Sequence, residues 1–202
     1  MRRLKTCSVV QGPRLPPYTR TEVLSMLLVH HRRFVEEAIS HIGTWNTRTL
    51  RAAGKLQELT HEMDRYRWNI LGLCEMRWKS FGETTIEEGH KVSFSGKDDK
   101  HEQGVGFRVH KDIVNTVMGC RPVSSRLITI RLRAVPFSIT IVQAYAQTSD
   151  YGDNEIEEFY DQLQNVIDQT PEKDILVVQG DECKSGQGCL WKLARHLWTL
   201  LQ

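Results

Sequence analysis

Four polar side chains stand where predicted strands end, and their types together suit metal-assisted phosphate chemistry. They are Asn46, Glu75, Tyr145 and Asp181. In open α/β sheets, functional groups collect beyond the carboxyl ends of the strands. Carboxylates bind Mg²⁺ well, usually one or two per ion with several waters retained, and a second carboxylate can orient or deprotonate an attacking water. The set therefore suits a hard cation and a phosphate ester.

Each of the four residues also has a purely structural interpretation. Asn46 fits a turn, and Tyr145 fits a core residue with a solvated hydroxyl. Glu75 and Asp181 fit solvated strand ends or helix caps. Taken singly, every one of them favours this structural interpretation, so the stronger signal is their joint order along the chain.

The elements expected to position these residues begin with a βαβ unit. In chain order, the predicted strands are 41–46, 69–74, 91–95, 104–109, 114–118, 126–133, 137–145 and 174–179, and the predicted helices are 54–67 and 153–169. The first helix is predicted because Leu56, Leu59 and Met63 recur at helical spacing. The strands 126–133 and 137–145 are expected to form a hairpin. The strands ending at Asn46, at Cys74 and at 179 are compact and apolar, which is typical of central strands, so we expect all three in one sheet.

The composition is that of an ordinary globular chain of 202 residues, with 40% hydrophobic and 26% charged residues. The formal net charge is only +2, so charge alone does not indicate a nucleic-acid-binding protein. The five cysteines are odd in number and include no CxxC pair, which indicates neither a disulfide framework nor a zinc site. We expect reduced thiols and a nuclear or cytoplasmic, intracellular protein. No apolar stretch approaches the length of a membrane span.

Basic residues are concentrated at the start of the chain. Residues 1–40 hold seven Lys or Arg and three Glu, whereas residues 41–202 hold 20 basic and 22 acidic residues. This leader is predicted to be disordered or partly helical over 21–40; a basic arm suits a polyanion, and a solvated leader explains it equally well. We expect residues 41–187 to form a partial domain. Residues 188–202 are expected to form an amphipathic helical tail, because four leucines recur there at helical spacing.

Six motifs in order identify a family resemblance. They are IGTWNTRTL at 42–50, NILGLCEMRW at 69–78, GVGFRV at 104–109, ITIVQAYAQTSD at 139–150, EIEEFYDQLQNVID at 155–168 and DILVVQGD at 174–181. The chain resembles the endonuclease/exonuclease/phosphatase superfamily, and within it the nuclease region of RTE/BovB-type non-LTR retrotransposons and related host proteins. The resemblance covers about residues 41–182 and implies a four-layer α-β-β-α sandwich, here incomplete.

The resemblance also implies a role for each of the four site residues. Glu75 would be the principal metal ligand, and Asn46 would help to bind the metal and phosphate. Tyr145 would contact the scissile phosphate, and Asp181 would position or activate the attacking water. The implied cofactor is Mg²⁺ or Mn²⁺, and the implied partner is DNA.

Two departures from the family pattern weaken the expectation of activity. Where the family has Gly-Asp-x-Asn, this chain has Gly180-Asp181-Glu182-Cys183, and a thiol cannot replace the hydrogen bonds of an amide. The chain is also expected to stop before the last third of the family domain. We therefore predict either a weak Mg²⁺-dependent phosphodiesterase of the endonuclease type or a non-catalytic remnant that binds nucleic acid or protein. Uncovered sheet edges would favour self-association.

Overall fold

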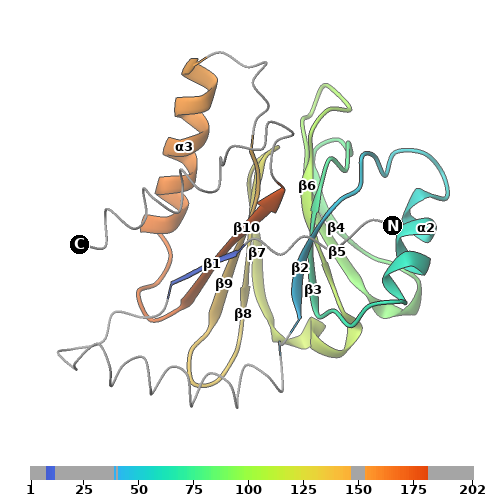
Figure 1. Ribbon diagram of the computed structural model, residues 1–202, viewed down its shortest axis with the longest axis horizontal. Helices are drawn as coiled ribbons and strands as arrows, with labels where there is room; N and C mark the ends of the chain where they lie inside the picture. Colours follow the sequence, from blue (N-terminus) through green and yellow to red (C-terminus); the bar gives the residue numbers. More distant parts are fainter. Residues whose placement is uncertain (1–7, 12–38, 40, 147–152, 182–202) are drawn as a thin grey trace.

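The computed structural model describes residues 8–11, 39, 41–146 and 153–181. The helix expected at 21–40, except for Ile39, lies outside these residues, as do the tail 188–202 and Cys183. The described part forms two five-stranded mixed sheets that pack face to face, with one α-helix outside each sheet (Figure 1). This arrangement is the four-layer sandwich that the motifs predict.

The first sheet, called sheet A, carries two of the four predicted site residues. Its strands, in spatial order, are β2 (Ile42–Asn46), β3 (Ile70–Cys74), β6 (Val105–Val109), β5 (Lys91–Ser95) and β4 (Phe81–Thr85). Strands β2 and β3 are parallel and the other neighbours antiparallel. Helix α2 (Lys55–Met63) joins β2 to β3 and lies outside sheet A (Figure 1). Two short 3-10 turns complete this half: η1 (Glu87–Gly89) and η2 (Lys111–Thr116).

The second sheet, called sheet B, carries the other two predicted site residues, Tyr145 and Asp181. Its strands, in spatial order, are β1 (Ser8–Gln11), β10 (Ile175–Asp181), β9 (Ile139–Tyr145), β8 (Leu127–Leu132) and β7 (Val117–Ser124). Strands β9 and β10 are parallel, and the crossover between them contains helix α3 (Asp153–Asp168). Strands β8 and β9 pair antiparallel, which confirms the predicted hairpin.

Three apolar layers hold the sandwich together, because successive side chains of a strand face opposite sides. Ile141 of β9 packs between the sheets, in a layer that includes Phe107 and Val177. Its neighbour Val142 points the other way and packs in the layer that includes Phe159 of α3. On the outer side of sheet A, the third layer includes Leu59 and Met63 of α2. Helix α2 is therefore held by the apolar spacing that predicted it.

One prediction about the sheets is wrong. We expected β10 to share a sheet with β2 and β3, but β10 lies in sheet B, against β9 and β1. A strand buried on both faces has the same apolar composition whether its neighbours belong to one sheet or to the facing one. A second correction concerns residues 114–118, predicted as a strand: η2 occupies residues up to Thr116, and strand β7 begins only at Val117.

No helix of the described residues is long and apolar enough to cross a membrane.

Candidate active site

Both parallel strand pairs end at the same edge of the sandwich. In sheet A, Asn46 is the register partner of Cys74, and Glu75 follows directly. In sheet B, Tyr145 is the register partner of Asp181. The two pairs meet across the interface, where the Cys74 thiol lies 3.8 Å from the carbonyl oxygen of Ala144. The structure thus brings the backbones of all four predicted residues to one edge; the side chain of Asp181 lies outside the described part.

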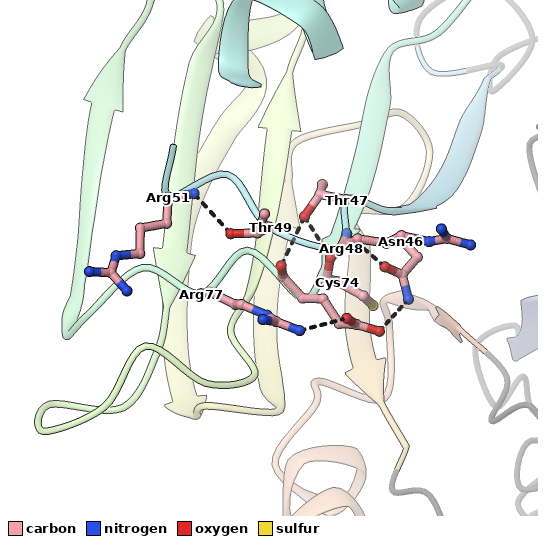
Figure 2. A network of polar contacts seen from close by, with 8 residues as sticks. Asn46, Thr47, Arg48, Thr49, Arg51, Cys74 and Arg77 are labelled. Atoms are coloured by element: carbon pink, nitrogen blue, oxygen red, sulfur yellow. Dashed lines mark hydrogen bonds and ion pairs between the residues drawn. The ribbon is translucent and has the colours of Figure 1, made fainter. Parts of the chain in front are cut away.

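The Glu75 carboxylate is held in place by Asn46. The Asn46 Nδ2 atom donates to Glu75 Oε1 at 2.7 Å, and the backbone N–H of Arg48 donates to Asn46 Oδ1 at 2.9 Å (Figure 2). The second bond fixes which end of the amide faces the carboxylate, since only the NH₂ end can donate. Asn46 and Glu75 are therefore in direct contact, as expected from their positions at neighbouring strand ends.

Thr47 ties the loop after β2 to the loop after β3. Its hydroxyl lies 2.9 Å from the carbonyl oxygen of Cys74 and 3.1 Å from that of Glu75 (Figure 2). Its backbone N–H donates to the same Cys74 oxygen at 2.9 Å. Glu75 itself has φ 56, a left-handed conformation that non-glycine residues adopt only when the surroundings impose it. The Thr47 contacts are part of what imposes it.

Arg77 is a site neighbour that sequence reasoning missed. Its Nη2 atom lies 3.6 Å from Glu75 Oε2, and the two side chains are 48% and 23% exposed (Figure 2). One carboxylate oxygen therefore contacts an amide and the other faces a guanidinium, with water still in reach. The signal in the sequence is a cation two residues after the candidate ligand, but a surface arginine gives no periodic pattern to identify it.

A buried polar layer lies one step below the site edge. Its polar members, each two residues before a predicted site residue on the same strand, are Thr44, Gln143 and Gln179. Residues two apart on a strand share a face, so this layer follows the site residues into the sandwich. Gln143 Nε2 donates to Thr44 Oγ1 at 3.1 Å and lies 3.0 Å from Cys74 Sγ, which links the two sheets.

Gly72 of β3 completes this polar layer. A Cβ atom there would lie 1.6 Å from Gln143 Oε1 and 2.5 Å from Gln179 Nε2, so the missing side chain makes room for both amides. Gln143 Oε1 and both amide atoms of Gln179 are buried without a hydrogen-bond partner in the described part of the structure. The sequence signal for this layer is a glutamine within an otherwise apolar strand, as in ITIVQAY and ILVVQGD. This layer was not predicted from the sequence.

The donors at the edge fit a hard divalent cation. Mg²⁺ takes oxygen ligands, commonly one or two carboxylates, and keeps several waters; Glu75 offers a partly exposed carboxylate of this kind. Among the described residues, no group of three or more His, Cys, Asp or Glu side chains could hold a metal ion by itself. An ion here would therefore retain much of its water, which is usual for Mg²⁺.

A hollow of about 570 Å³ lies beside the site, between the loop after β2 and helix α2. Thr47, Arg48 and Lys55 are among its lining residues, and Glu75 is not. Lys55 pairs with Glu58, another lining residue, at 2.7 Å. Because its charges are mixed and it does not include the carboxylate, this hollow is a neighbour of the site rather than its centre.

Comparison with known proteins finds relatives of this chain in two mammals. It is 35% identical over 140 residues to craniofacial development protein 2 of Tragulus javanicus and, to the same extent, of Bos taurus. The match covers 69% of this chain but only 24% and 23% of those proteins, so the chain spans about a quarter of their length. No family model matches the sequence.

The comparison of structures gives the fold. The catalytic domain of Xenopus laevis APE2 superposes with a TM-score of 0.50 at 16% identity, over 69% of this chain and 57% of that one. At this identity the likeness concerns the fold alone. Together with the two-sheet architecture, it confirms the predicted endonuclease/exonuclease/phosphatase fold.

Proposed function

We propose that this chain, a homologue of craniofacial development protein 2 with the endonuclease/exonuclease/phosphatase fold, carries a divalent-metal-dependent phosphodiesterase site that cleaves DNA. The observation that carries the proposal is the 2.7 Å hydrogen bond from Asn46 to Glu75. It holds a partly exposed carboxylate at the edge where the strands of Tyr145 and Asp181 also end. A carboxylate held in place in this way suits a hard cation that assists phosphate hydrolysis.

Glu75 and Asn46 are the residues that would hold Mg²⁺ or Mn²⁺. Such an ion, when bound, neutralises charge that develops on the phosphate and makes a coordinated water more acidic. Asn46 supports the site by fixing the Glu75 carboxylate through its NH₂ group. Groups that orient a metal ligand in this way matter nearly as much as the ligand itself.

Sheet B would supply the remaining chemistry. Tyr145 is half-buried against the core between the sheets, and we assign its hydroxyl to a non-bridging oxygen of the scissile phosphate. Asp181, its register partner, is assigned to hold the attacking water and accept its proton. These two assignments rest on strand register and on the family motif.

DNA is the proposed substrate because three exposed arginines lie on the loops that carry the site, and one of them, Arg77, contacts the Glu75 carboxylate. Arg48, Arg51 and Arg77 are all exposed and lie on the two loops that follow β2 and β3. Guanidinium groups at such a rim neutralise backbone phosphates, which is the main source of affinity for nucleic acids. The net charge of +2 is too small to attract DNA without this local concentration.

The Arg77 contact favours a second candidate function, a nucleic-acid-binding module that uses no metal. The guanidinium lies 3.6 Å from Glu75 Oε2, where it supplies a positive charge next to the carboxylate. In this alternative, the Arg77–Glu75 pair is structural and the rim arginines bind phosphates without cleaving them.

A nicking assay separates the two functions. Supercoiled plasmid is incubated with the chain and Mg²⁺, with EDTA, and with the variant Glu75→Gln, which keeps the size of the side chain and removes its charge. Glu58→Gln, an exposed glutamate on α2, is the matched control. The enzyme proposal expects metal-dependent nicking that Glu75→Gln abolishes and Glu58→Gln preserves. Plasmid binding without metal-dependent nicking would establish the binding module instead.

A further inference from the structure

The segment from Glu75 to Phe81, called the rim segment, leads from the candidate site to the outer strand of sheet A. Strand register places Phe81 level with Cys74, because Phe81 pairs with Ser95, Ser95 with Val105, and Val105 with Cys74. Three strand spacings of about 4.8 Å separate the two, so Phe81 stands roughly 14 Å from the start of the site along the same edge. The rim segment thus runs along the edge at which we place the chemistry.

The half of the rim segment nearer the site is fixed to the neighbouring loop. The backbone N–H of Met76 donates to Gly104 O at 3.1 Å, and that of Arg77 donates to Gln103 O at 2.8 Å. Met76 is fully buried. Arg77 has φ 57, a conformation that these contacts impose on a non-glycine residue.

The half of the rim segment farther from the site, from Trp78 onwards, is also held by several contacts. The Trp78 indole N–H donates to Leu50 O at 3.0 Å, and its ring meets Phe94 edge-on at 4.9 Å. The backbone of Ser80 is bonded at both its N–H and its carbonyl, to Lys97 and Gly96. A Cβ atom on Gly96 would lie 1.9 Å from the carbonyl oxygen of Trp78, so only glycine permits this close crossing.

The exposed side chains of this segment include two cations and one aromatic ring, those of Arg77, Lys79 and Phe81. Phe81 is 68% exposed. Two other large apolar side chains, Met118 and Val135, are also exposed in the described part of the chain. They lie at the opposite end of sheet B, near the β8–β9 turn. Single exposed apolar residues are common, so the position of Phe81 at the site edge, after two cations, is what calls for an explanation.

We infer that the rim segment binds an unpaired stretch of DNA strand, with Arg77 and Lys79 on its phosphates and Phe81 stacked on a base. Cations that follow the backbone, combined with an aromatic ring that stacks on a base, are the general means of binding single strands. A base inside a duplex has both faces covered, so Phe81 stacks on an unpaired base without the cost of unstacking a duplex. The inference rests on the proposed function for its choice of nucleic acid, and it deepens that function by naming the class of substrate.

The distance sets the size of the unpaired stretch. A stacked strand advances about 3.4 Å per nucleotide, so the roughly 14 Å between Cys74 and Phe81 corresponds to about four stacked nucleotides, and to fewer in an extended strand. The preferred substrate is therefore DNA whose cleaved phosphate lies next to a short single-stranded region, such as an overhang or a gap.

Binding measured in EDTA tests this inference apart from catalysis. Fluorescence anisotropy follows the full chain binding a single-stranded oligonucleotide, a blunt duplex, and a duplex with a four-nucleotide overhang. We expect Phe81→Ala to weaken binding to the single strand and the overhang by about 5- to 100-fold, and to leave the blunt duplex within about twofold. Val135→Ala is the matched apolar control and should change none of the three. A 2-aminopurine in the overhang should be quenched by the native chain and not by Phe81→Ala.

A second set of variants separates stacking from folding. Phe81→Trp should preserve single-strand binding, whereas Phe81→Leu, which is apolar but has no ring, should lose it; the melting temperatures of both should match the native chain. Arg77→Gln with Lys79→Gln should weaken binding, and Lys111→Gln with Lys173→Gln, exposed lysines at the opposite end, should not.

The results also distinguish this inference from the proposed function. Phe81-dependent binding of single strands without any nicking would support the rim segment and contradict the enzyme. Metal-dependent nicking, with Phe81→Ala indistinguishable from the native chain in single-strand binding, would overturn the rim segment alone. An equal loss on blunt duplex would also overturn it, because the interior base pairs of a duplex are covered on both faces.

Discussion

At the scale of single residues, the candidate site depends on one amide. Asn46 donates one hydrogen bond to the Glu75 carboxylate and accepts one from the Arg48 backbone N–H. These two bonds hold the Glu75 side chain in its observed orientation. The sequence predicted that Asn46 and Glu75 would lie together, because both stand at the ends of apolar strands. It could not predict Arg77 or Thr47, whose importance comes from contacts between two loops rather than from any periodicity.

Removing the Asn46 amide should weaken the metal-dependent cleavage that we assign to Glu75. We expect Asn46→Ala to lower metal-dependent nicking by about 10- to 100-fold, the usual cost of losing a partner that orients a metal ligand. The Mg²⁺ concentration for half-maximal rate should rise, because the carboxylate is no longer held. Thr49→Ala is the control, because the Thr49 hydroxyl in the same loop accepts from the Arg51 N–H instead (Figure 2). An unchanged Mg²⁺ dependence in Asn46→Ala would show that the contact has no role in metal binding.

At the scale of elements, the strands that the sequence predicted well are those with a clear burial pattern. Strand β5 was predicted with its observed bounds, 91–95. Strand β4 was missed because it is an exposed edge strand, FGETT, whose side chains show no alternation of apolar and polar. Strand β10 was assigned to the wrong sheet because it is buried on both faces. Strands of this kind have the same apolar composition in either sheet.

The buried polar layer predicts the effect of filling Gly72. A methyl group there would collide with Gln143 Oε1, so Gly72→Ala should lower the free energy of unfolding by about 1–3 kcal/mol, the typical cost of overpacking a core. Gln143→Ala in the same chain should restore part of the loss by making room. Chemical denaturation of the two single variants and the double variant measures this coupling. Strict additivity would mean that the two side chains do not compete for the same space.

A cluster at the other end of sheet A predicts a loss of stability in acid. His90, Trp68, His110 and Arg108 lie together, with His90 and His110 ring centroids 4.6 Å apart and the Arg108 guanidinium 4.8 Å from the Trp68 ring. Burial lowers the pKa of His90, and the nearby charges of Arg108 and His110 lower it further, while Glu88 opposes the shift in part. Well above pH 6.5 the imidazole is neutral in both the folded and the unfolded chain, so its titration does not make the stability depend on pH there.

As the pH falls through about 6.5, the unfolded chain binds a proton that the folded chain resists, so folding stability falls until the pH reaches the lowered folded-state pKa. We expect the melting temperature to fall between about pH 7.5 and 5.5, and to fall less in His90→Gln, whose amide oxygen can still accept the Lys111 N–H bond. His61→Gln, an exposed residue of α2, should follow the native curve. A His90→Gln curve that coincides with the native one would contradict the assignment.

At the scale of the whole molecule, the fold brings two loops from sheet A and two strand ends from sheet B to a single edge, in a chain whose formal net charge is only +2. DNA binding should therefore depend on few charges. If Arg48, Arg51, Arg77 and Lys79 each neutralise one phosphate of a single strand, log Kd should change with log salt concentration with a slope of magnitude about 3. Arg77→Gln with Lys79→Gln should halve it. A slope near zero, or one unaffected by the two substitutions, would place the binding surface elsewhere.

The central claim is that Glu75, held by Asn46, forms a metal-bearing site. Titration of Mn²⁺ into the chain, followed by the EPR signal of the free ion, tests it without any substrate. We predict one bound Mn²⁺ per chain that Mg²⁺ displaces, that Glu75→Gln removes, and that Asn46→Ala weakens about 10- to 100-fold. Glu58→Gln should bind as the native chain does. A native chain that leaves all Mn²⁺ free, or a Glu75→Gln variant that binds it unchanged, would contradict the account.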